Sequence, residues 1–358
     1  MLPYLYVYVA TMFFLFFYQA KEFKLFNWFF LSITIFSLSL LYYLRDYSIG
    51  LDTYTYVDII RDVSYIDDFN GLIEYSASYN IEFGFILFLC FLGLLGLNAS
   101  SIFFVSAILI YSNLFLALKN VKINAILYFS AFFSYCAIFF WSFNILRQMV
   151  AVSFVIVATT FLLKNFKFKF FLFVLIASTF HYSAIVCLVF YLVYRNIDFI
   201  FRFRWLLVGI VSILSKFILL VISSYYPRYS SYSSGDSASG IGFLLFAFYV
   251  SIFIFSGLLY KRIKDYGSEY KFFVSIFSIY FGLQLAFIIN GISTFGTTRI
   301  LIYFLWPSVF IVGIFMKNID KEYRYIFNCL LFLFLTFYFL YALNSTGYNY
   351  TPFRFLIG

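Results

Sequence analysis

The chain has 358 residues, of which 65% are hydrophobic, 27% aromatic and only 11% charged, and its formal net charge is +9. This composition excludes a water-soluble globule, because too few polar side chains are present to cover its surface. It also argues against a nucleic-acid-binding protein, because Lys and Arg occur in small groups at the ends of apolar runs and form no continuous basic stripe. The partner that the composition indicates is the lipid bilayer.

The apolar runs predict membrane-spanning helices. A helix needs about 20 apolar residues to cross about 30 Å of hydrocarbon. Runs of roughly this length occupy residues 3–19, 25–44, 122–140, 144–163, 203–222, 241–260, 270–289, 300–316 and 324–342. The first run lacks the basic segment and small-residue cleavage site of a signal peptide, so we expect it to be kept as a span.

Charge between the runs predicts which loops lie on which side of the membrane. We place the basic groups in the cytoplasm. They are Lys21 and Lys24; Lys119 and Lys122; Lys164, Lys167 and Lys169; Arg195, Arg202 and Arg204; Lys261, Arg262, Lys264 and Lys271; and Lys317, Lys321 and Arg324. The segment 45–80 is acidic and is therefore predicted to face outward.

This sidedness restricts two regions where the number of crossings is otherwise unclear. Residues 81–118 must cross once, so part of that stretch, around Gly93–Asn98, must be re-entrant, kinked or interfacial. Residues 168–194 must go out and come back, which predicts two short helices meeting near His181. We therefore expect a single transmembrane domain over residues 1–358, an all-α, GT-C-like polytopic bundle of about 12 crossings with both termini outside.

A second outer loop is predicted over residues 223–240, which are rich in Ser and Tyr. One interpretation is a plain solvated connector. The alternative is that its tyrosines and Arg228 line a groove for a sugar, because aromatic faces stack on pyranose rings.

The absence of several known sequence motifs narrows the range of reactions that the protein could catalyse. The sequence has no P-loop, GxGxxG, GxSxG, HExxH or Asp-x-Asp pattern, and its single histidine cannot build a site with several His ligands. The four cysteines occur singly inside apolar runs without CxxC spacing, so we expect packing residues and no disulfide framework. We predict no metal and no cofactor, and a donor substrate without a nucleotide.

Two arginines at the predicted outer ends of spans are candidates for binding phosphate. Arg147 is followed by Gln148, and Arg299 has Tyr303 one turn away. A guanidinium stays charged when desolvated and can bind phosphate with two parallel hydrogen bonds. The alternative for each is an arginine that snorkels to the membrane interface.

Acid–base candidates follow from the remaining polar residues. Arg45 heads the outer segment, Gly50 permits a turn, and Asp52 is our first choice as a base, with a helix N-cap or an ion pair to Arg45 as the alternative. Asp58, Glu74 and Glu82 are weaker candidates for the base. His181 is predicted to donate to phosphate or shuttle a proton, or else to bond a neighbouring helix.

Four stretches together resemble the EpsG-like family of membrane polysaccharide polymerases, to which many Wzy-type O-antigen polymerases belong. They are RDYSIGLDTYTY (45–56), ILRQMVA (145–151), KFKFFLFVLIASTFHYSA (167–184) and TTRILIYFLWP (297–307). One departure is Leu51, where related sequences often have a small hydroxyl residue. The resemblance implies roles for Arg45, Gly50, Asp52, Arg147, Gln148, His181 and Arg299, and we include Tyr56, Tyr303 and Arg228 among the expected substrate-binding residues.

The resemblance implies an enzyme of the bacterial inner membrane that acts on its periplasmic side. It would transfer a growing glycan from undecaprenyl diphosphate to the non-reducing end of another undecaprenyl-diphosphate-linked unit, with a chain-length regulator protein as an expected partner. Three alternatives remain open: an O-antigen ligase, a flippase or transporter for lipid-linked sugars, and a membrane acyltransferase built around His181.

Overall fold

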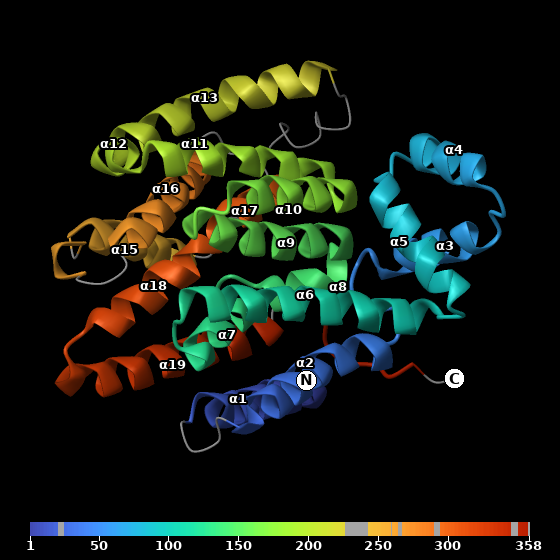
Figure 1. Cartoon of the computed structure of the whole chain (residues 1–358), viewed down its shortest axis with the longest axis horizontal. Helices are drawn as coiled ribbons and strands as arrows, with labels where there is room; N and C mark the ends of the chain where they lie inside the picture. Colours follow the sequence, from blue (N-terminus) through green and yellow to red (C-terminus); the bar gives the residue numbers. More distant parts are fainter. Residues whose placement is uncertain are drawn as a thin grey trace. The chain divides into compact units, whose positions relative to one another are not determined.

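The structure is a computed structural model that describes residues 1–20, 25–225, 243–258, 260–263, 267–289, 294–344 and 350–356. All regular elements among these residues are helical (Figure 1). They form two compact units, Met1–Val186 with Ile326–Gly358, and Cys187–Tyr325. A single transmembrane domain over residues 1–358 stays a prediction.

Seven helical stretches in the described residues are long and apolar enough to cross a membrane, or eight if one bent pair counts as a span. They are α1 (Leu2–Gln19), α2 (Asn27–Leu44), α6 (Ala99–Val121), α9 (Leu146–Leu163), α16 (Gly267–Ile289), Arg299–Asn318 and α19 (Lys321–Asn344). The bent pair is α7 (Ala125–Phe133) and α8 (Ile138–Asn144), which meet at 44°. A polytopic helical membrane protein is thereby confirmed, whereas about 12 crossings are not.

In the first unit, α2 packs against α1 and α6, α6 against α9, and α9 against α10 (Lys167–Phe180). Polar pairs join α6 to α9 inside this apolar packing. Asn113 Nδ2 donates to Ser153 Oγ at 3.0 Å, and Asn120 Nδ2 donates to Thr160 Oγ1 at 2.8 Å. Such hydrogen bonds between helices satisfy polar groups that hydrocarbon cannot.

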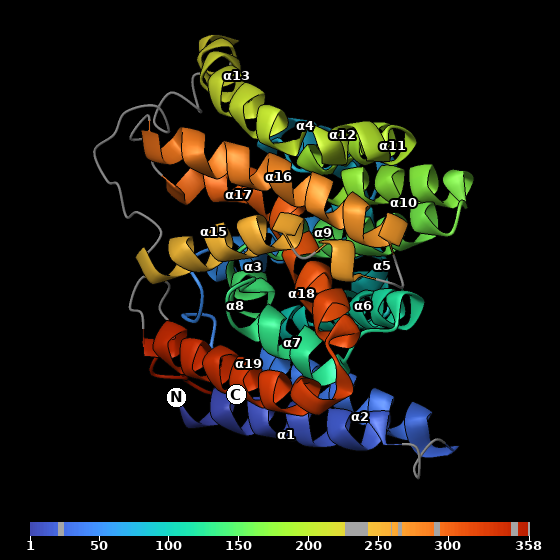
Figure 2. The same cartoon turned by 90° about the vertical axis from the view of Figure 1, so that its left-hand side faces the viewer.

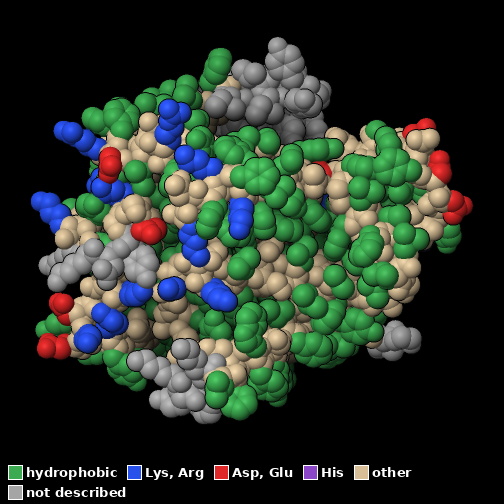
Figure 3. All heavy atoms as spheres, viewed as in Figure 1, with side chains coloured by type: hydrophobic (Ala, Val, Ile, Leu, Met, Phe, Trp, Pro, Cys, Tyr) green, Lys and Arg blue, Asp and Glu red, His purple; other side chains and the backbone are tan. Residues whose placement is uncertain are grey.

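Opposite charges occupy opposite ends of the first unit. Tyr47, in the acidic segment, contacts Ser100 at the start of α6 with hydroxyl oxygens 3.2 Å apart. Lys119 lies near the other end of α6, about 30 Å away along the helix. Figure 3 shows acidic side chains gathered over α3 (Thr53–Ser64) and α4 (Phe69–Tyr79). This is the separation that two sides of a bilayer require, and the outward direction itself stays a prediction.

Two local predictions agree with the helix lengths. The stretch 81–118 contains one helix long enough to span, α6, preceded by α5 (Phe83–Leu94), whose 12 residues reach only about 18 Å. The stretch 168–194 is divided as predicted, because α10 ends at Phe180 and a 3₁₀ helix begins at Tyr182. His181 lies at the break, in an extended backbone conformation with φ −157° and ψ 115°.

In the second unit, α16 is the central helix. It packs against α12 (Ile197–Arg202), α13 (Arg204–Tyr225), α15 (Phe243–Leu258), α17 (Thr294–Leu305) and α18 (Pro307–Asn318), and also against α11 (Val189–Arg195), as the two views in Figures 1 and 2 show. An ion pair of 2.6 Å between Lys271 and Asp198 joins α16 to α12. Of the predicted outer loop 223–240, residues 223–225 end α13, and the rest, including Arg228, lies outside the described residues.

Candidate active site

Glu82 is the centre of a polar cluster in the first unit. It follows α4, whose last turn is closed by Asn80 in a left-handed conformation, and it forms the N-cap position of α5. Its residue surface is only 3% exposed. A carboxylate buried to this extent requires charged or hydrogen-bonding partners, because an unpaired charge in an apolar environment is costly.

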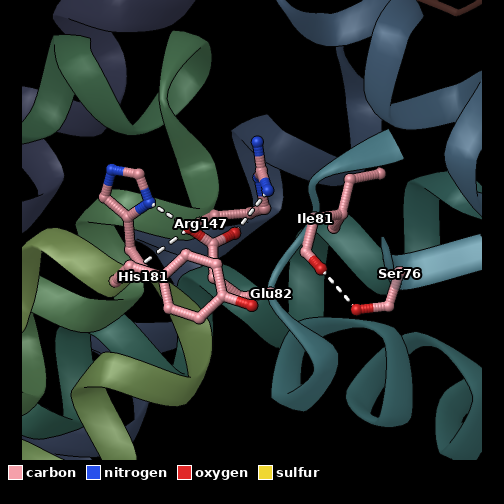
Figure 4. Close-up of polar contacts among 6 residues, drawn as sticks. Ser76, Ile81, Glu82, Arg147 and His181 are labelled. Carbon is pink, nitrogen blue, oxygen red and sulfur yellow. Dashed lines mark hydrogen bonds and ion pairs between the residues drawn. The ribbon is translucent and has the colours of Figure 1, made fainter. Parts of the chain in front are cut away.

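The partners of Glu82 come from two helices that are distant in sequence (Figure 4). Arg147 Nη1 donates to Glu82 Oε2 at 2.5 Å, and His181 Nδ1 lies 2.6 Å from Glu82 Oε1. The backbone N–H of Tyr182 also donates to Oε1, at 3.2 Å. One carboxylate therefore holds both a guanidinium and an imidazole, and each of those two side chains remains partly exposed.

The backbone beside Glu82 explains why α5 lies against the end of α10. Gly84 contacts Thr179 so closely that a Cβ at Gly84 would lie 2.5 Å from Thr179 Oγ1 and 2.8 Å from its carbonyl oxygen. Ser76 Oγ donates to the Ile81 carbonyl at 2.6 Å, which fixes the turn that leads into Glu82 (Figure 4). Glycine at position 84 thus permits the approach that brings Glu82 to His181.

The charge state of Glu82 follows from its partners. Burial alone would raise the pKa of Glu82, but the hydrogen bond from His181 and the positive charge of Arg147 outweigh burial and lower the pKa below its usual value. Glu82 is therefore ionised at neutral pH, and its carboxylate accepts the Nδ1 proton of His181. The imidazole then presents Nε2 as its basic nitrogen.

Arg147 lies in the first turn of α9, directly after the break that separates α9 from α8. Tyr56, on α3, hydrogen-bonds to its guanidinium, and the charge of Asp52 acts on both Arg147 and Tyr56. The guanidinium carbon also lies 5.7 Å from the ring centre of Phe85. Glu82 engages one of the two terminal nitrogens, so the fork retains further N–H donors.

Asp52, predicted as the base, precedes α3 and makes no side-chain capping hydrogen bond to that helix. It lies near the Arg147 and Tyr56 side chains, as their electrostatic interactions indicate. Gly50, two residues earlier, has φ +90°, a backbone conformation that favours glycine. The turn predicted at Gly50 is therefore present, and it places Asp52 beside the cluster.

Arg45 is fully buried and does not reach the surface of the unit. Its Nη1 donates to the carbonyl oxygen of Phe143 at 2.9 Å. Its guanidinium carbon lies 4.7 Å from the ring centre of Phe103 and 5.0 Å from that of Phe143. Burial lowers the pKa of Arg45 to about 10, so it remains charged at neutral pH. Through these contacts Arg45 holds the Phe143 backbone and the rings of Phe103 and Phe143 together.

The remaining predicted site residues are not brought into this cluster by the described geometry. Gln148 is buried on α9. Arg299 is exposed and Tyr303 is buried, and both lie on α17 in the second unit. Convergence of Arg147 with Arg299 on one phosphate therefore stays a prediction. Within the described residues, no group of three His, Cys, Asp or Glu side chains is placed to hold a metal ion.

Comparison with known proteins gives one match. Residues 28–355 match the model of the EpsG family. The chain belongs to the EpsG family. No curated protein and no solved structure matches it. Membership of the EpsG family agrees with a function like that of a polysaccharide polymerase, in the glycosyltransferase class, and the matched region includes all residues of the Glu82 cluster.

Glu82 lies at the centre of the polar cluster of this EpsG-family chain, whereas from the sequence it was only one of the weaker candidates for the base. Asp52 was preferred because a carboxylate on a helix that returns towards the membrane can serve as a base, whereas several other acids of the outer segment must be solvated. A signal for Glu82 was nevertheless present, since it is the one carboxylate directly before the apolar run 83–95. An acidic residue at such a boundary needs a partner when the run is buried.

Proposed function

We propose that this EpsG-family protein polymerises a polysaccharide from lipid-diphosphate-linked repeat units, as O-antigen polymerases do. The donor is a growing glycan on undecaprenyl diphosphate, and the acceptor is a hydroxyl group at the non-reducing end of a second lipid-linked unit. The observation that best supports this proposal is the bridging of His181 and Arg147 by Glu82, because the reaction needs both a base and a cation.

In this proposal His181 is the general base. Its Nε2 accepts the proton of the acceptor hydroxyl while the acceptor oxygen forms a bond to the anomeric carbon of the donor. Glu82 fixes the ring orientation and stabilises the imidazolium that forms, the role that a buried carboxylate has beside a catalytic histidine. We prefer His181 to Asp52 as the base because the Glu82 hydrogen bond orients the imidazole.

Arg147 has the complementary role on the leaving group. The bond between the anomeric carbon and the diphosphate oxygen breaks, and the electron pair stays on the diphosphate. The N–H groups of Arg147 that Glu82 does not engage stabilise this developing charge more in the transition state than in the ground state. Arg299 is proposed as a second cation for the same diphosphate, so that no metal is required.

The other predicted residues have supporting roles. Tyr56 holds the Arg147 guanidinium from the side of α3, and Asp52 is proposed to bind acceptor hydroxyl groups near it. Arg45 is assigned a structural role in place of the substrate contact predicted from sequence, because it is fully buried. Gln148 and Tyr303 are also buried, so we assign them structural roles as well. Arg228 is still proposed to contact sugar.

We further propose that the site faces the periplasm and that the protein lies in the bacterial inner membrane with a chain-length regulator as partner. Cysteine labelling tests the sidedness in a background without the natural cysteines. Tyr65 is 77% exposed in the acidic segment, so Tyr65→Cys should react with an impermeant maleimide in intact spheroplasts. Lys119→Cys should react only after lysis. The reverse pattern would contradict the orientation.

Complementation tests the reaction. The gene is expressed in a polymerase-deficient strain that makes the matching repeat unit, and the surface glycan is separated by electrophoresis. A polymerase restores a ladder of repeat lengths. A ligase or a flippase leaves the single-unit product unchanged in that strain, so absence of a ladder at normal protein level would contradict the proposal.

A further inference from the structure

The C-terminal segment of the chain lies beside the start of the acidic segment, within the first unit. The Asp46 N–H donates to the Arg354 carbonyl at 2.9 Å, and the Leu356 N–H donates to the Leu44 carbonyl at 3.0 Å. In Figure 1 this segment is the red trace that passes the end of α2. The last described residues are thus paired with the backbone on both sides of Arg45.

Tyr350 connects this C-terminal segment to the end of α8. It is only 2% exposed, and its hydroxyl group donates to the Phe140 carbonyl at 2.8 Å. Asn144 Nδ2 donates to the same hydroxyl oxygen. From the other side, the hydroxyl group of Tyr4 on α1 donates to the Tyr350 carbonyl at 2.9 Å. Three hydrogen bonds from two helices, α8 and α1, therefore fix Tyr350.

Asn144 continues the connection towards the candidate active site. Its Oδ1 accepts the Leu51 N–H at 2.6 Å, next to Gly50 and Asp52. A side-chain amide that donates at one end and accepts at the other can occupy only one orientation. The hydrogen bonds thus run from Tyr350 through Asn144 to Leu51 without a gap.

The carbonyl group of Phe143, next to Asn144, also holds the Gly50–Asp52 loop against the end of α8. It accepts from Arg45 Nη1 at 2.9 Å and from Thr53 Oγ1 at 3.4 Å. A Cβ at Gly50 would lie 2.5 Å from this carbonyl oxygen, so the loop approaches as closely as glycine allows. Phe143 and Asn144 end α8 only four and three residues before Arg147, and their position therefore affects where α9 presents its guanidinium.

We propose that Tyr350 and Asn144 are positioning residues of the active site, which set the Gly50–Asp52 loop relative to Arg147. Neither residue touches substrate in this proposal. Tyr350 acts through Asn144, and Asn144 acts through the Leu51 N–H. The effect on catalysis rests on the proposed polymerase function, whereas the effect on the loop does not.

Hydrogen exchange of the wild-type protein in nanodiscs tests the loop directly, followed by mass spectrometry of peptides that cover residues 45–53. Removal of a neutral hydrogen bond is worth about 1 kcal/mol, or roughly fivefold in an opening equilibrium. Asn144→Ala should speed exchange of the Leu51 amide by about fivefold or more, and Tyr350→Phe by a smaller factor. Asn144→Asp keeps the acceptor oxygen and should retain most of the protection.

A double variant distinguishes an effect of Tyr350 that passes through Asn144 from a general increase in the mobility of the loop. If Tyr350 acts through Asn144, Tyr350→Phe adds no further exchange in the Asn144→Ala background. Tyr341→Phe is the matched control, because Tyr341 is 62% exposed on α19 and should leave exchange unchanged. Additive effects, or a Tyr350→Phe loop that exchanges like wild type, would overturn the proposal.

The complementation assay then connects the loop to activity. Tyr350→Phe and Asn144→Ala should shorten the ladder at normal protein level. Asn144→Asp keeps the Leu51 acceptor but loses the Nδ2 donor to Tyr350, so it should resemble Tyr350→Phe. Tyr341→Phe should leave the ladder unchanged. If the wild-type chain itself gives no ladder, the proposed function fails while the exchange result still decides the positioning role. If exchange rises as expected but the ladder stays normal, the positioning of catalytic groups is contradicted.

Discussion

Glu82 Oε1 lies 2.6 Å from His181 Nδ1, although the two residues are 99 positions apart in the chain. The contact exists because α5 begins where α10 ends. It places a buried, ionised carboxylate behind the one histidine of the sequence. A histidine supported in this way has a fixed ring orientation and one basic nitrogen available for chemistry.

Neutralising Glu82 tests the importance of this carboxylate. Glu82→Gln removes the charge that orients His181 and balances Arg147, so we expect polymer formation to fall by about 10²-fold or more. The measurement is the amount of glycan ladder at matched protein level. Glu74→Gln is the control, because Glu74 is an exposed acidic residue of α4. Equal loss in both variants would show that Glu82 has no special role.

The ion pair between Arg147 and Glu82 predicts a specific pattern of stability. Arg147→Ala leaves a carboxylate that is 4% exposed without its cation, and we expect a loss of about 3 kcal/mol in the free energy of unfolding. Adding Glu82→Ala should recover part of this loss, because the unpaired charge is then gone. The measurement is unfolding in detergent for both single variants and the double variant. Simple additivity would contradict the pairing.

The glycine at the start of α5 gives a test that leaves the polar residues intact. Gly84→Ala forces α5 away from Thr179, and we expect at least about a tenfold loss of activity because the Glu82 to His181 distance increases. Gly93→Ala, on the same helix, has nothing within 4 Å of the added Cβ and should be neutral. Thr179→Gly should restore part of the Gly84→Ala activity. No difference between the two alanine variants would refute the requirement for close approach.

The lowered pKa of Glu82 predicts how stability changes with pH. Its unfolded-state value is about 4.3, and the folded-state value lies below it, so the contribution of Glu82 is fully present above about pH 4.3. It is lost as the pH falls through the folded-state pKa. The difference in unfolding temperature between wild type and Glu82→Gln should therefore be constant near neutral pH and shrink in acid. A difference that grows in acid would contradict this sign.

The sequence predicted the fold better than the site. Apolar run length located most of the spans. The span α6 was expected only as one crossing within 81–118, and the described parts of 203–222 and 241–260 contain shorter apolar helices. Charge distribution alone located the break near His181, since two short helices were needed between Lys169 and Arg195. The break between α7 and α8 was not predicted, because residues 122–140 look like one continuous apolar run. Hydropathy records composition and is insensitive to a local bend.

The site was harder to predict because its residues meet only in three dimensions. Arg147 and His181 were identified individually, as charged residues near apolar spans. Their joint partner Glu82 was ranked below Asp52, since nothing in the sequence shows that α5 folds back against α10. Arg45 was expected to bind substrate. In the structure it is fully buried among aromatic rings and donates to the Phe143 carbonyl, which the sequence alone does not show.

The most direct measurement is the rate at which purified protein in nanodiscs lengthens a lipid-diphosphate-linked repeat unit, compared between wild type, His181→Ala, Glu82→Gln and the double variant. If Glu82 acts by orienting His181, His181→Ala is slower by about 10²-fold or more, and the double variant is no slower than His181→Ala alone. A His181→Ala protein that works at the wild-type rate would contradict the account.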